Sequence, residues 1–201
     1  MKIIIATRNA HKLEEIHAIF DFRGLEICSA FDFPDVPDVI EDGDTLEANA
    51  IKKAVELCEA TGLPALADDS GLEVEALNGA PGVFSARYAG EECSYSANND
   101  KLLRELEGET NRRAQFRTVI AFARPDAPPQ TVEGICQGRI IDEPRGEHGF
   151  GYDPLFVPDG FNHTFAELPA DEKNRISHRA RALNAAANLW KEELQRMSNI
   201  K

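Results

Sequence analysis

The chain of 201 residues has only four cysteines and no long apolar run. The cysteines, at positions 28, 58, 93 and 136, are far apart and form no Cys-x-x-Cys pair, which argues against a zinc or redox motif and predicts reduced thiols. No apolar stretch approaches the roughly 20 residues of a membrane helix. The first apolar segment is too short for a signal peptide. We therefore expect a cytoplasmic protein without membrane contact.

Basic residues are also scarce, because 22 lysines and arginines face 35 acidic residues and give a net charge of −13. Nucleic-acid-binding surfaces are usually basic, so this charge argues against a nucleic-acid partner. A small anion is still compatible with it. A polyphosphate would have to enter with a divalent cation and bind a local cluster of basic side chains and backbone amides.

The first half of the chain alternates strands and helices. Residues 2–6 are predicted to form a buried strand, and a polar loop then precedes a helix whose apolar positions are Leu13, Ile16, Ile19 and Phe20 and which stops at Gly24. A second strand is expected at 25–29. The loop 30–44 follows and is long for a compact domain, which is typical of functional loops. Thr45 is predicted to cap a helix that ends at Gly62 and carries Asn49 and Lys53 on one face.

Two adjacent acids, Asp68 and Asp69, follow a short apolar run and precede Ser70-Gly71. We expect them at the end of a strand, at the edge of a sheet, with a further apolar segment at 72–77. Adjacent carboxylates repel, so the pair costs stability unless a metal, a lysine or a helix start compensates. The alternative is that one acid caps the next element while water solvates the other.

The second half looks partly antiparallel. A helix is expected at 97–106, and two longer strands at 116–123 and 131–141, joined by a loop at 125–129. A glycine- and aromatic-rich segment at 146–154 leads into a strand at 155–157. A polar turn at 173–179 then precedes a long helix with four apolar residues inward: Ala182, Ala186, Leu189 and Leu194. These elements predict one α/β domain over residues 1–201, with a mixed sheet and helices on its faces.

Phosphate handling is the strongest chemical theme, because three separate segments supply suitable groups. They are Thr7, Asn9 and Lys12 before the first helix, Lys53 on the next helix, and Lys173 with Arg179. Mg²⁺ prefers oxygen ligands and binds through one or two carboxylates plus substrate phosphates, and Glu41 and Asp69 could supply them. Phe150 and Tyr152 offer stacking faces for a nucleobase, or else fold into the core around a tight turn.

Five motifs together resemble one family, the non-canonical purine NTP pyrophosphatases, also called inosine triphosphatases or the Ham1-like family. They are TxNxxK at 7–12, ADDSGLEV at 67–74, APGVFSARY at 80–88, GFGYDPLF at 149–156 and KNRISHR at 173–179. The resemblance spans nearly the whole chain. It implies two lobes with an active-site cleft between them, a homodimer, and Mg²⁺-dependent hydrolysis of dITP, ITP and XTP to the monophosphate and pyrophosphate.

The resemblance also implies roles for individual residues. Asp69 would be the general base and a metal ligand, and Glu41 the second metal ligand. Substrate contacts would come from Thr7, Arg8, Asn9, Ala10, His11, Lys12, Lys53, Ser70, Phe150, Gly151, Tyr152, Asp153, Lys173, His178 and Arg179, the last two reading the 6-oxo edge of the base. Two positions depart from the family pattern. Arg8 stands where glycine is frequent, and Ala48-Asn49-Ala50 stands where relatives often show Glu-Asn-Ala, with Glu47 one place earlier.

Two other functions stay open on the sequence. A Maf-type nucleotide pyrophosphatase shares the general architecture and acts on other nucleotides. A non-catalytic protein that binds nucleotides without turnover needs the same basic groups.

Overall fold

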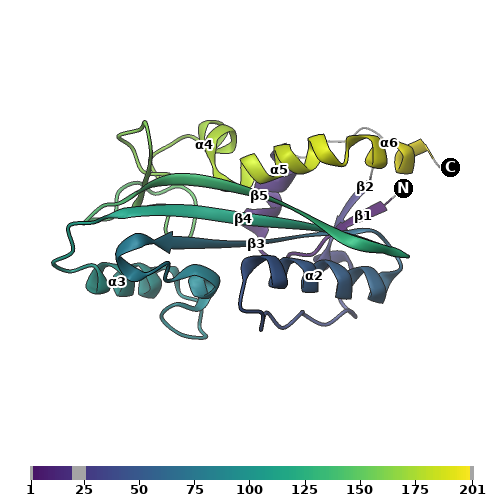
Figure 1. Cartoon of the computed structure of the whole chain (residues 1–201), viewed down its shortest axis with the longest axis horizontal. Helices are drawn as coiled ribbons and strands as arrows, with labels where there is room; N and C mark the ends of the chain where they lie inside the picture. Colours follow the sequence, from purple (N-terminus) through teal and green to yellow (C-terminus); the bar gives the residue numbers. More distant parts are fainter. Residues whose placement is uncertain (1, 20–25, 200–201) are drawn as a thin grey trace. The chain divides into compact units, whose positions relative to one another are not determined.

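The computed structural model describes residues 2–19 and 26–199. Its strands are β1 (Lys2–Ile5), β2 (Glu26–Ser29), β3 (Ala65–Val74), β4 (Arg113–Arg124), β5 (Ala127–Ile140) and β6 (Phe156–Pro158). Its helices are α1 (Ala10–Ile19), α2 (Leu46–Thr61), α3 (Tyr95–Glu105), α4 (Ala170–Ile176), α5 (His178–Leu189) and α6 (Lys191–Asn199), shown in Figure 1. Three short 3₁₀ helices occupy Ala30–Asp32, Glu75–Leu77 and Gly82–Arg87.

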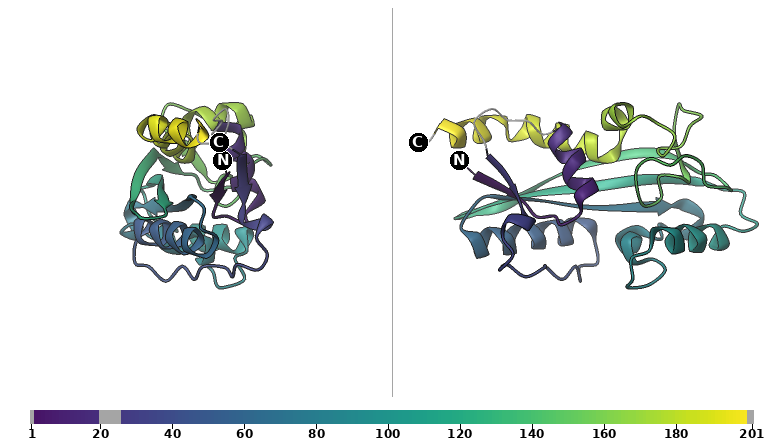
Figure 2. Two further views of the ribbon diagram at one scale, coloured as in Figure 1. Left: turned by 90° about the vertical axis from the view of Figure 1, so that its right-hand side faces the viewer. Right: turned by 180° about the vertical axis from the view of Figure 1, so that it is seen from behind.

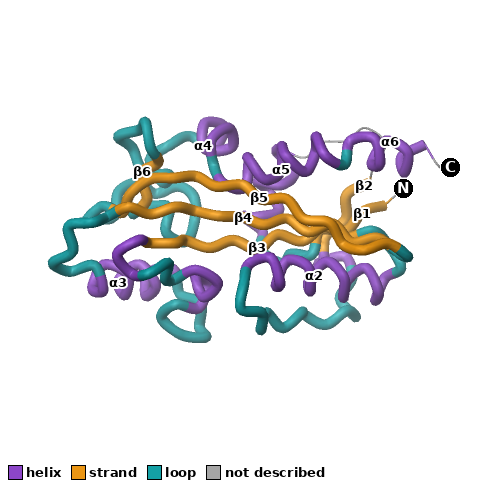
Figure 3. Tube along the Cα trace, in the orientation of Figure 1, coloured by secondary structure: helices purple, strands orange, loops and turns teal. Residues whose placement is uncertain are grey.

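The strands form one mixed sheet in the order β2-β1-β3-β4-β5-β6. β1 pairs in parallel with both β2 and β3, whereas the short β6 pairs antiparallel with the end of β5. Figure 3 shows the strands of the sheet in orange. The predicted α/β class with a mixed sheet is confirmed. In the part of the chain that the structure describes, no helix is both long enough and apolar enough to cross a bilayer.

The chain divides into two compact units. The first unit contains Met1–Asp69, Thr118–Gly134 and Ala180–Lys201, and the second contains Ser70–Arg117 and Ile135–Arg179. In the first unit α2 covers one face of the strands, and α5 and α6 cover the other (Figures 1 and 2). In the second unit α3 and α4 lie on opposite sides of the strands (Figure 1).

Each unit has its own hydrophobic core. In the first unit, α1 and α5 pack on β1, β3 and β4 around Phe122 and Trp190, whose ring centroids are 5.1 Å apart. In the second unit the rings of Phe116, Phe156 and Phe165 pack together, with centroid distances of 4.7, 5.1 and 5.9 Å. Burial of these side chains is the main driving force for folding each unit.

The helix α2 has the predicted bounds because its end signals are local. Thr45 Oγ1 accepts a hydrogen bond from the Ala48 amide at 3.1 Å. Gly62 closes the helix in the left-handed region at φ 69°, which glycine adopts without strain. By contrast, the predicted end of the preceding helix at Gly24, its apolar Phe20 and the predicted strand start at Leu25 lie outside the described residues.

The strand prediction around the acid pair is wrong. Asp68 and Asp69 lie in the middle of the continuous strand β3, and 75–77 form a 3₁₀ helix. The strand continues through Ser70-Gly71. Gly71 is needed there for a close approach of two backbone segments and does not mark a strand end. A Cβ at Gly71 would overlap the carbonyl oxygen of Gly82.

The loop predicted at 125–129 is shorter than expected. β4 and β5 are joined by two residues, Pro125 and Asp126, with Asp126 at φ 61°. Pro128 and Pro129 therefore belong to β5. Proline is tolerated there because β6 pairs only with Gly138–Ile140, so the start of β5 has a free edge on that side among the described strands.

The C-terminal region also differs from the sequence prediction. The expected polar turn at 173–179 is largely the helix α4, followed by Ser177 and the start of α5. The long helix is interrupted at Trp190. Ala182, Ala186 and Leu194 are buried as predicted, but Leu189 is 61% exposed, and the neighbouring Trp190 is buried instead.

Replacement of Trp190 should strongly destabilise the protein. Its ring is 1% exposed, and its Nε1 donates to Gln130 Oε1 at 2.7 Å. We expect Trp190→Ala to lower the free energy of unfolding by about 3–5 kcal/mol. The neighbouring Leu189→Ala should change it by less than about 0.5 kcal/mol. Urea denaturation measures both, and equal effects would contradict the assigned burial.

Candidate functional site

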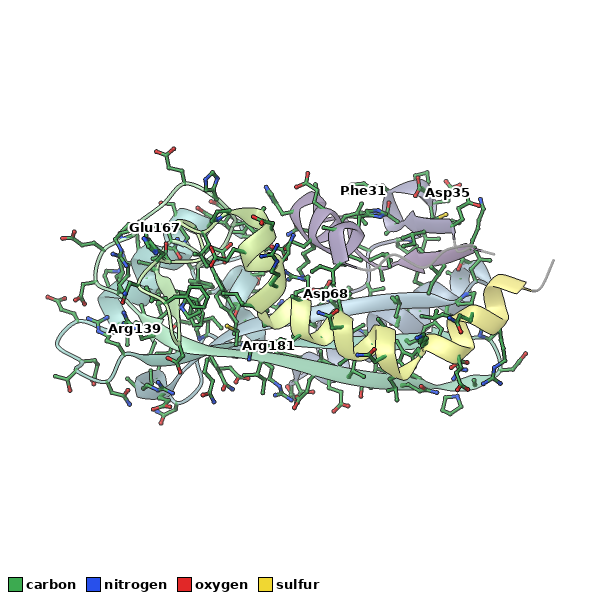
Figure 4. The ribbon with its side chains drawn as sticks, turned by 90° about the horizontal axis from the view of Figure 1, so that it is seen from above. Phe31, Asp35, Asp68, Arg139, Glu167 and Arg181 are labelled. Atoms are coloured by element: carbon green, nitrogen blue, oxygen red, sulfur yellow. The ribbon has the colours of Figure 1, made fainter. Side chains whose placement is uncertain are left out.

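The acid pair on β3 sends its two carboxylates to opposite faces of the sheet, since successive strand residues alternate. Leu66, two residues before Asp68, belongs to the core beneath α1 and α5. Asp68 (labelled in Figure 4) shares that face, and its Oδ2 lies 3.1 Å from Lys12 Nζ. Asp69 faces α2 and pairs with Lys53. Each buried acid therefore has its own lysine, which is one of the three compensations that the sequence allows.

Lys12 is placed by the loop before α1. Asn9 Oδ1 accepts hydrogen bonds from the amides of His11 at 3.0 Å and Lys12 at 3.2 Å, so it caps the helix. The Asn9 amide donates to Thr7 Oγ1 at 3.1 Å. Ala10 and His11 are exposed on the first turn. This loop thus presents a helix N-terminus, which suits an anion, with Lys12 beside it.

Arg8 is held by the long loop 30–44. Its guanidinium pairs with Asp38 Oδ1 at 2.9 Å and donates to the carbonyl of Val36 at 2.7 Å. The charge of Arg8 is thus balanced by Asp38, and its side chain connects the loop before α1 to the loop 30–44.

The helix α2 brings Asn49 and Lys53 to Asp69, as their spacing of four residues predicts. Lys53 Nζ donates to Asp69 Oδ1 at 3.1 Å, Glu41 Oε1 at 2.7 Å and the Asp68 carbonyl at 2.8 Å. Asn49 Nδ2 donates to Asp69 Oδ2 at 3.3 Å. The Asn49 side-chain oxygen in turn accepts from the Gly43 amide at 2.8 Å. One helix face therefore fixes both Asp69 and the loop that carries Glu41.

Burial and charge set the protonation of this cluster. Burial raises the pKa of Asp69, Lys53 lowers it and Glu41 raises it, so the pKa ends above the ordinary aspartate value. Burial opposes the charged form of Lys53, but Asp69, Glu41 and Asp68 outweigh it and raise its pKa. Lys53 stays cationic while Asp69 is a stronger base than a free aspartate, which suits a group that accepts a proton.

The same cluster fits a hard divalent cation. Asp69 and Glu41 bring oxygen ligands to one place, and the Glu41 side chain keeps 34% of its surface exposed. Within residues 2–19 and 26–199, no three His, Cys, Asp or Glu side chains gather as a metal site. Mg²⁺ suits such a set, because it binds through one or two carboxylates and takes its other ligands from water and phosphates.

In the second unit, Ser70 and Arg179 come together. Arg179 is 1% exposed, and its guanidinium donates to Ser70 Oγ at 3.2 Å. The neighbouring His178 is also buried and stacks on Phe116, with ring centroids 4.5 Å apart and an angle of 11°. Both residues begin α5, so helix geometry and a packed ring fix their directions.

The glycine-rich segment is organised by Asp153. Its Oδ2 accepts from the Phe150 amide at 2.8 Å and from Lys173 Nζ at 2.7 Å. A Cβ at Gly149, whose φ is 73°, would overlap that carboxylate. The Phe150 ring has Lys173 Nζ 5.0 Å and the Arg179 guanidinium 5.7 Å from its centroid. These groups therefore form a second cluster, built around an aromatic ring.

The two aromatic residues of this segment have different places. Tyr152 is 4% exposed and donates its hydroxyl to the Ser85 carbonyl at 2.9 Å, so its ring belongs to the core. Phe150 stays partly exposed, and next to it Gly151 accepts a hydrogen bond from Asn99. A stacking role, which the sequence allowed for either ring, is left to Phe150.

Several contributing residues are not among the predicted site residues. The spacing of four residues between Asn49 and Lys53 predicts a shared helix face, and this is the sequence signal for the contact of Asn49 with Asp69. Asp68 is predicted only as half of the acid pair. Ser85 lies inside the motif at 80–88, where its hydroxyl accepts from the Leu72 amide at 2.9 Å and donates to the Gly82 carbonyl at 2.6 Å. No pattern in the sequence indicated that this hydroxyl supports β3 beside Gly71.

Removal of Lys53 should raise the pKa of Asp69 further, because Lys53 is the strongest influence that lowers it. We expect Lys53→Met to shift the titration of the Asp69 carboxyl to higher pH. In Lys52→Met it should not move, since Lys52 pairs with Asp42 and Glu56 on the surface. Carboxyl ¹³C NMR of the metal-free protein measures the titration, and an unchanged pKa in Lys53→Met would contradict the assigned electrostatics.

Known proteins resemble this chain over most of its length. A model of the Ham1 family matches residues 3–189. A dITP/XTP pyrophosphatase from Geobacter sulfurreducens is 54% identical over 184 residues, covering 90% of this chain and 92% of that protein. One from Geobacillus kaustophilus is 50% identical over 193 residues, covering 95% of each.

Solved structures give the same result. The Ham1 protein of Staphylococcus aureus superposes with a TM-score of 0.88 at 41% identity, covering 96% of this chain and 100% of that one. A nucleoside-triphosphatase named dITP/XTP pyrophosphatase from Mycobacterium abscessus gives a TM-score of 0.77 at 44% identity, covering 92% and 98%. With sequence, fold and length in agreement, the chain belongs to the Ham1 family.

Proposed function

We propose that the protein is a dITP/XTP pyrophosphatase that hydrolyses dITP, ITP and XTP to the monophosphate and pyrophosphate. The observation that carries this proposal is its 54% identity, over 90% of the chain, to a relative named for that activity. The raised pKa of the buried Asp69 supports it, because such a carboxylate suits a general base. By family resemblance we also propose that the protein works as a cytoplasmic homodimer.

In the proposed reaction, a water molecule attacks the phosphate chain and the bond between the α-phosphorus and the bridging oxygen breaks. Asp69 takes the proton of that water, and pyrophosphate leaves with the bridging oxygen. Lys12 and Lys53 offset negative charge that develops on the leaving group. Asn49 and Lys53 hold the Asp69 carboxylate in one orientation, so the base needs little rearrangement before it accepts the proton.

A charge count favours a divalent cation in this site. Asp68, Asp69 and Glu41 supply three negative charges against two positive charges on Lys12 and Lys53, which leaves the cluster at about −1. A triphosphate would be repelled by that balance. We propose that Asp69 and Glu41 hold Mg²⁺, which when bound neutralises phosphate charge and favours the leaving pyrophosphate.

We propose that the second cluster binds the base. Phe150 offers a stacking face, and His178 and Arg179 offer hydrogen-bond donors at the 6-position. A 6-oxo purine presents an acceptor there, whereas adenine presents an amino group that also donates. Two opposed donors in a buried site are costly, so adenine nucleotides should be rejected. Lys173 and Asp153 are buried and paired, so we expect them to fix this cluster from within.

Substitution of the proposed base should remove turnover but not the fold. We expect Asp69→Asn to lower kcat for dITP by about 10²- to 10⁴-fold, the usual contribution of a general base. Glu47→Gln is the matched control, because Glu47 is exposed and accepts a hydrogen bond from Thr131 Oγ1 at 2.8 Å. Its kcat should match the unmodified protein. Near-normal turnover in Asp69→Asn would exclude Asp69 as the base.

Base selection should appear as a difference in kcat/KM. We expect dITP to exceed dATP by about 10²-fold or more, because the mismatch leaves buried donors unpaired. Steady-state pyrophosphate release with Mg²⁺ measures both substrates in one assay. Equal values would refute selective recognition, and the absence of turnover with dITP, ITP and XTP alike would overturn the proposed function.

A further inference from the structure

We propose that Tyr95, on the first turn of α3, contacts the base of the bound nucleotide and extends the aromatic surface of Phe150. The proposal rests on the function proposed above and adds a specificity-determining residue to it. Its basis is a pair of contacts that α3 makes to the glycine-rich segment.

The first step is placement. Tyr95 and Asn99 are four residues apart, so they lie on one face of α3. Asn99 Nδ2 donates to the Gly151 carbonyl at 3.1 Å, and the Tyr95 ring lies beside Phe150 with centroids 6.1 Å apart and an angle of 40°. A single helix face therefore holds two consecutive residues of the segment, Phe150 and Gly151.

The second step is the exposure of the ring. Tyr95 keeps 40% of its surface exposed, although Asn98 and Leu102 on the same helix are almost fully buried. Ser94 Oγ accepts from the Ala97 amide at 3.3 Å and caps the helix, which fixes the start of α3 and hence the place of Tyr95. A large ring that is half-exposed at a fixed position, beside a second aromatic ring, is a surface on which a base can stack.

The third step is the surroundings of Phe150. Lys173 and Arg179 lie over its ring, and Arg179 bonds Ser70, the residue that follows Asp69 in the chain. A base that stacks on Phe150 with its 6-oxo group toward Arg179 is therefore within reach of a second ring from α3. A purine has two fused rings and covers more aromatic surface than a pyrimidine, so this addition favours purines.

If Tyr95 contacts the base, its removal should weaken the binding of nucleotides but not of a phosphate chain without a base. We expect Tyr95→Ala to raise KM for ITP by about 5-fold or more, the lower end for loss of one base–aromatic stack. Inhibition of ITP hydrolysis by inorganic tripolyphosphate, which has no base, should keep its Ki. Tyr95→Phe keeps the ring and should restore the KM.

Two further variants complete the experiment. Tyr95→Leu keeps a large apolar side chain and a good helix former but lacks the ring. It should raise KM for ITP by the same factor as Tyr95→Ala, and it provides the test if the alanine variant folds poorly. Phe84→Ala removes another exposed ring of the second unit, 56% exposed, and should leave KM and Ki unchanged.

The outcomes separate the two proposals. If the unmodified protein hydrolyses ITP and both Tyr95→Ala and Tyr95→Leu keep its KM, the base contact is refuted while the proposed function stands. If KM for ITP and Ki for tripolyphosphate rise equally, Tyr95 only supports the fold around Phe150, and the base contact is again refuted. If the unmodified protein cleaves no purine nucleotide, the proposed function itself falls.

Discussion

The buried ammonium group of Lys53 is the contact on which the candidate site depends. It joins a carboxylate on β3, a carboxylate from the long loop and a strand carbonyl, all within 3.1 Å. A buried charge without partners is costly, so burial of the Lys53 ammonium group requires that these three acceptors are in place around it. Thr45 and Gly62 set where the helix that carries Lys53 begins and ends.

Elements whose signals are local could be predicted from the sequence. The cap at Thr45, the left-handed Gly62 and the face shared by Asn49 and Lys53 depend on a few neighbouring residues. Errors arose where distant parts of the chain decide. Gly71 suggests a strand end, but it is a glycine because the Gly82 backbone passes against it. Pro128 suggests a loop, but it lies at the start of β5, where none of the described strands pairs on the β6 side.

The site divides in the same way. The family resemblance pointed to residues that the structure gathers into two clusters, one around Asp69 and one around Phe150. It did not show how each residue is placed. Tyr152 has the chemistry of a stacking residue, yet its hydroxyl reaches the Ser85 carbonyl and its ring is buried. Such a choice between core and ligand depends on a partner 67 residues away, which no local pattern reveals.

The two clusters also differ in charge, and the difference matches their proposed tasks. Around Asp69 the acids outnumber the lysines, so the proposed phosphate site needs an added cation. Around Phe150, Lys173 and Arg179 outnumber Asp153, so the proposed base site needs no added cation for the carbonyl oxygen of an uncharged base. Asp69, proposed to activate water, and Ser70, whose hydroxyl accepts a hydrogen bond from Arg179, are consecutive residues of β3. The overall charge of −13 is thus compatible with a nucleotide substrate, since local balance rather than net charge decides binding.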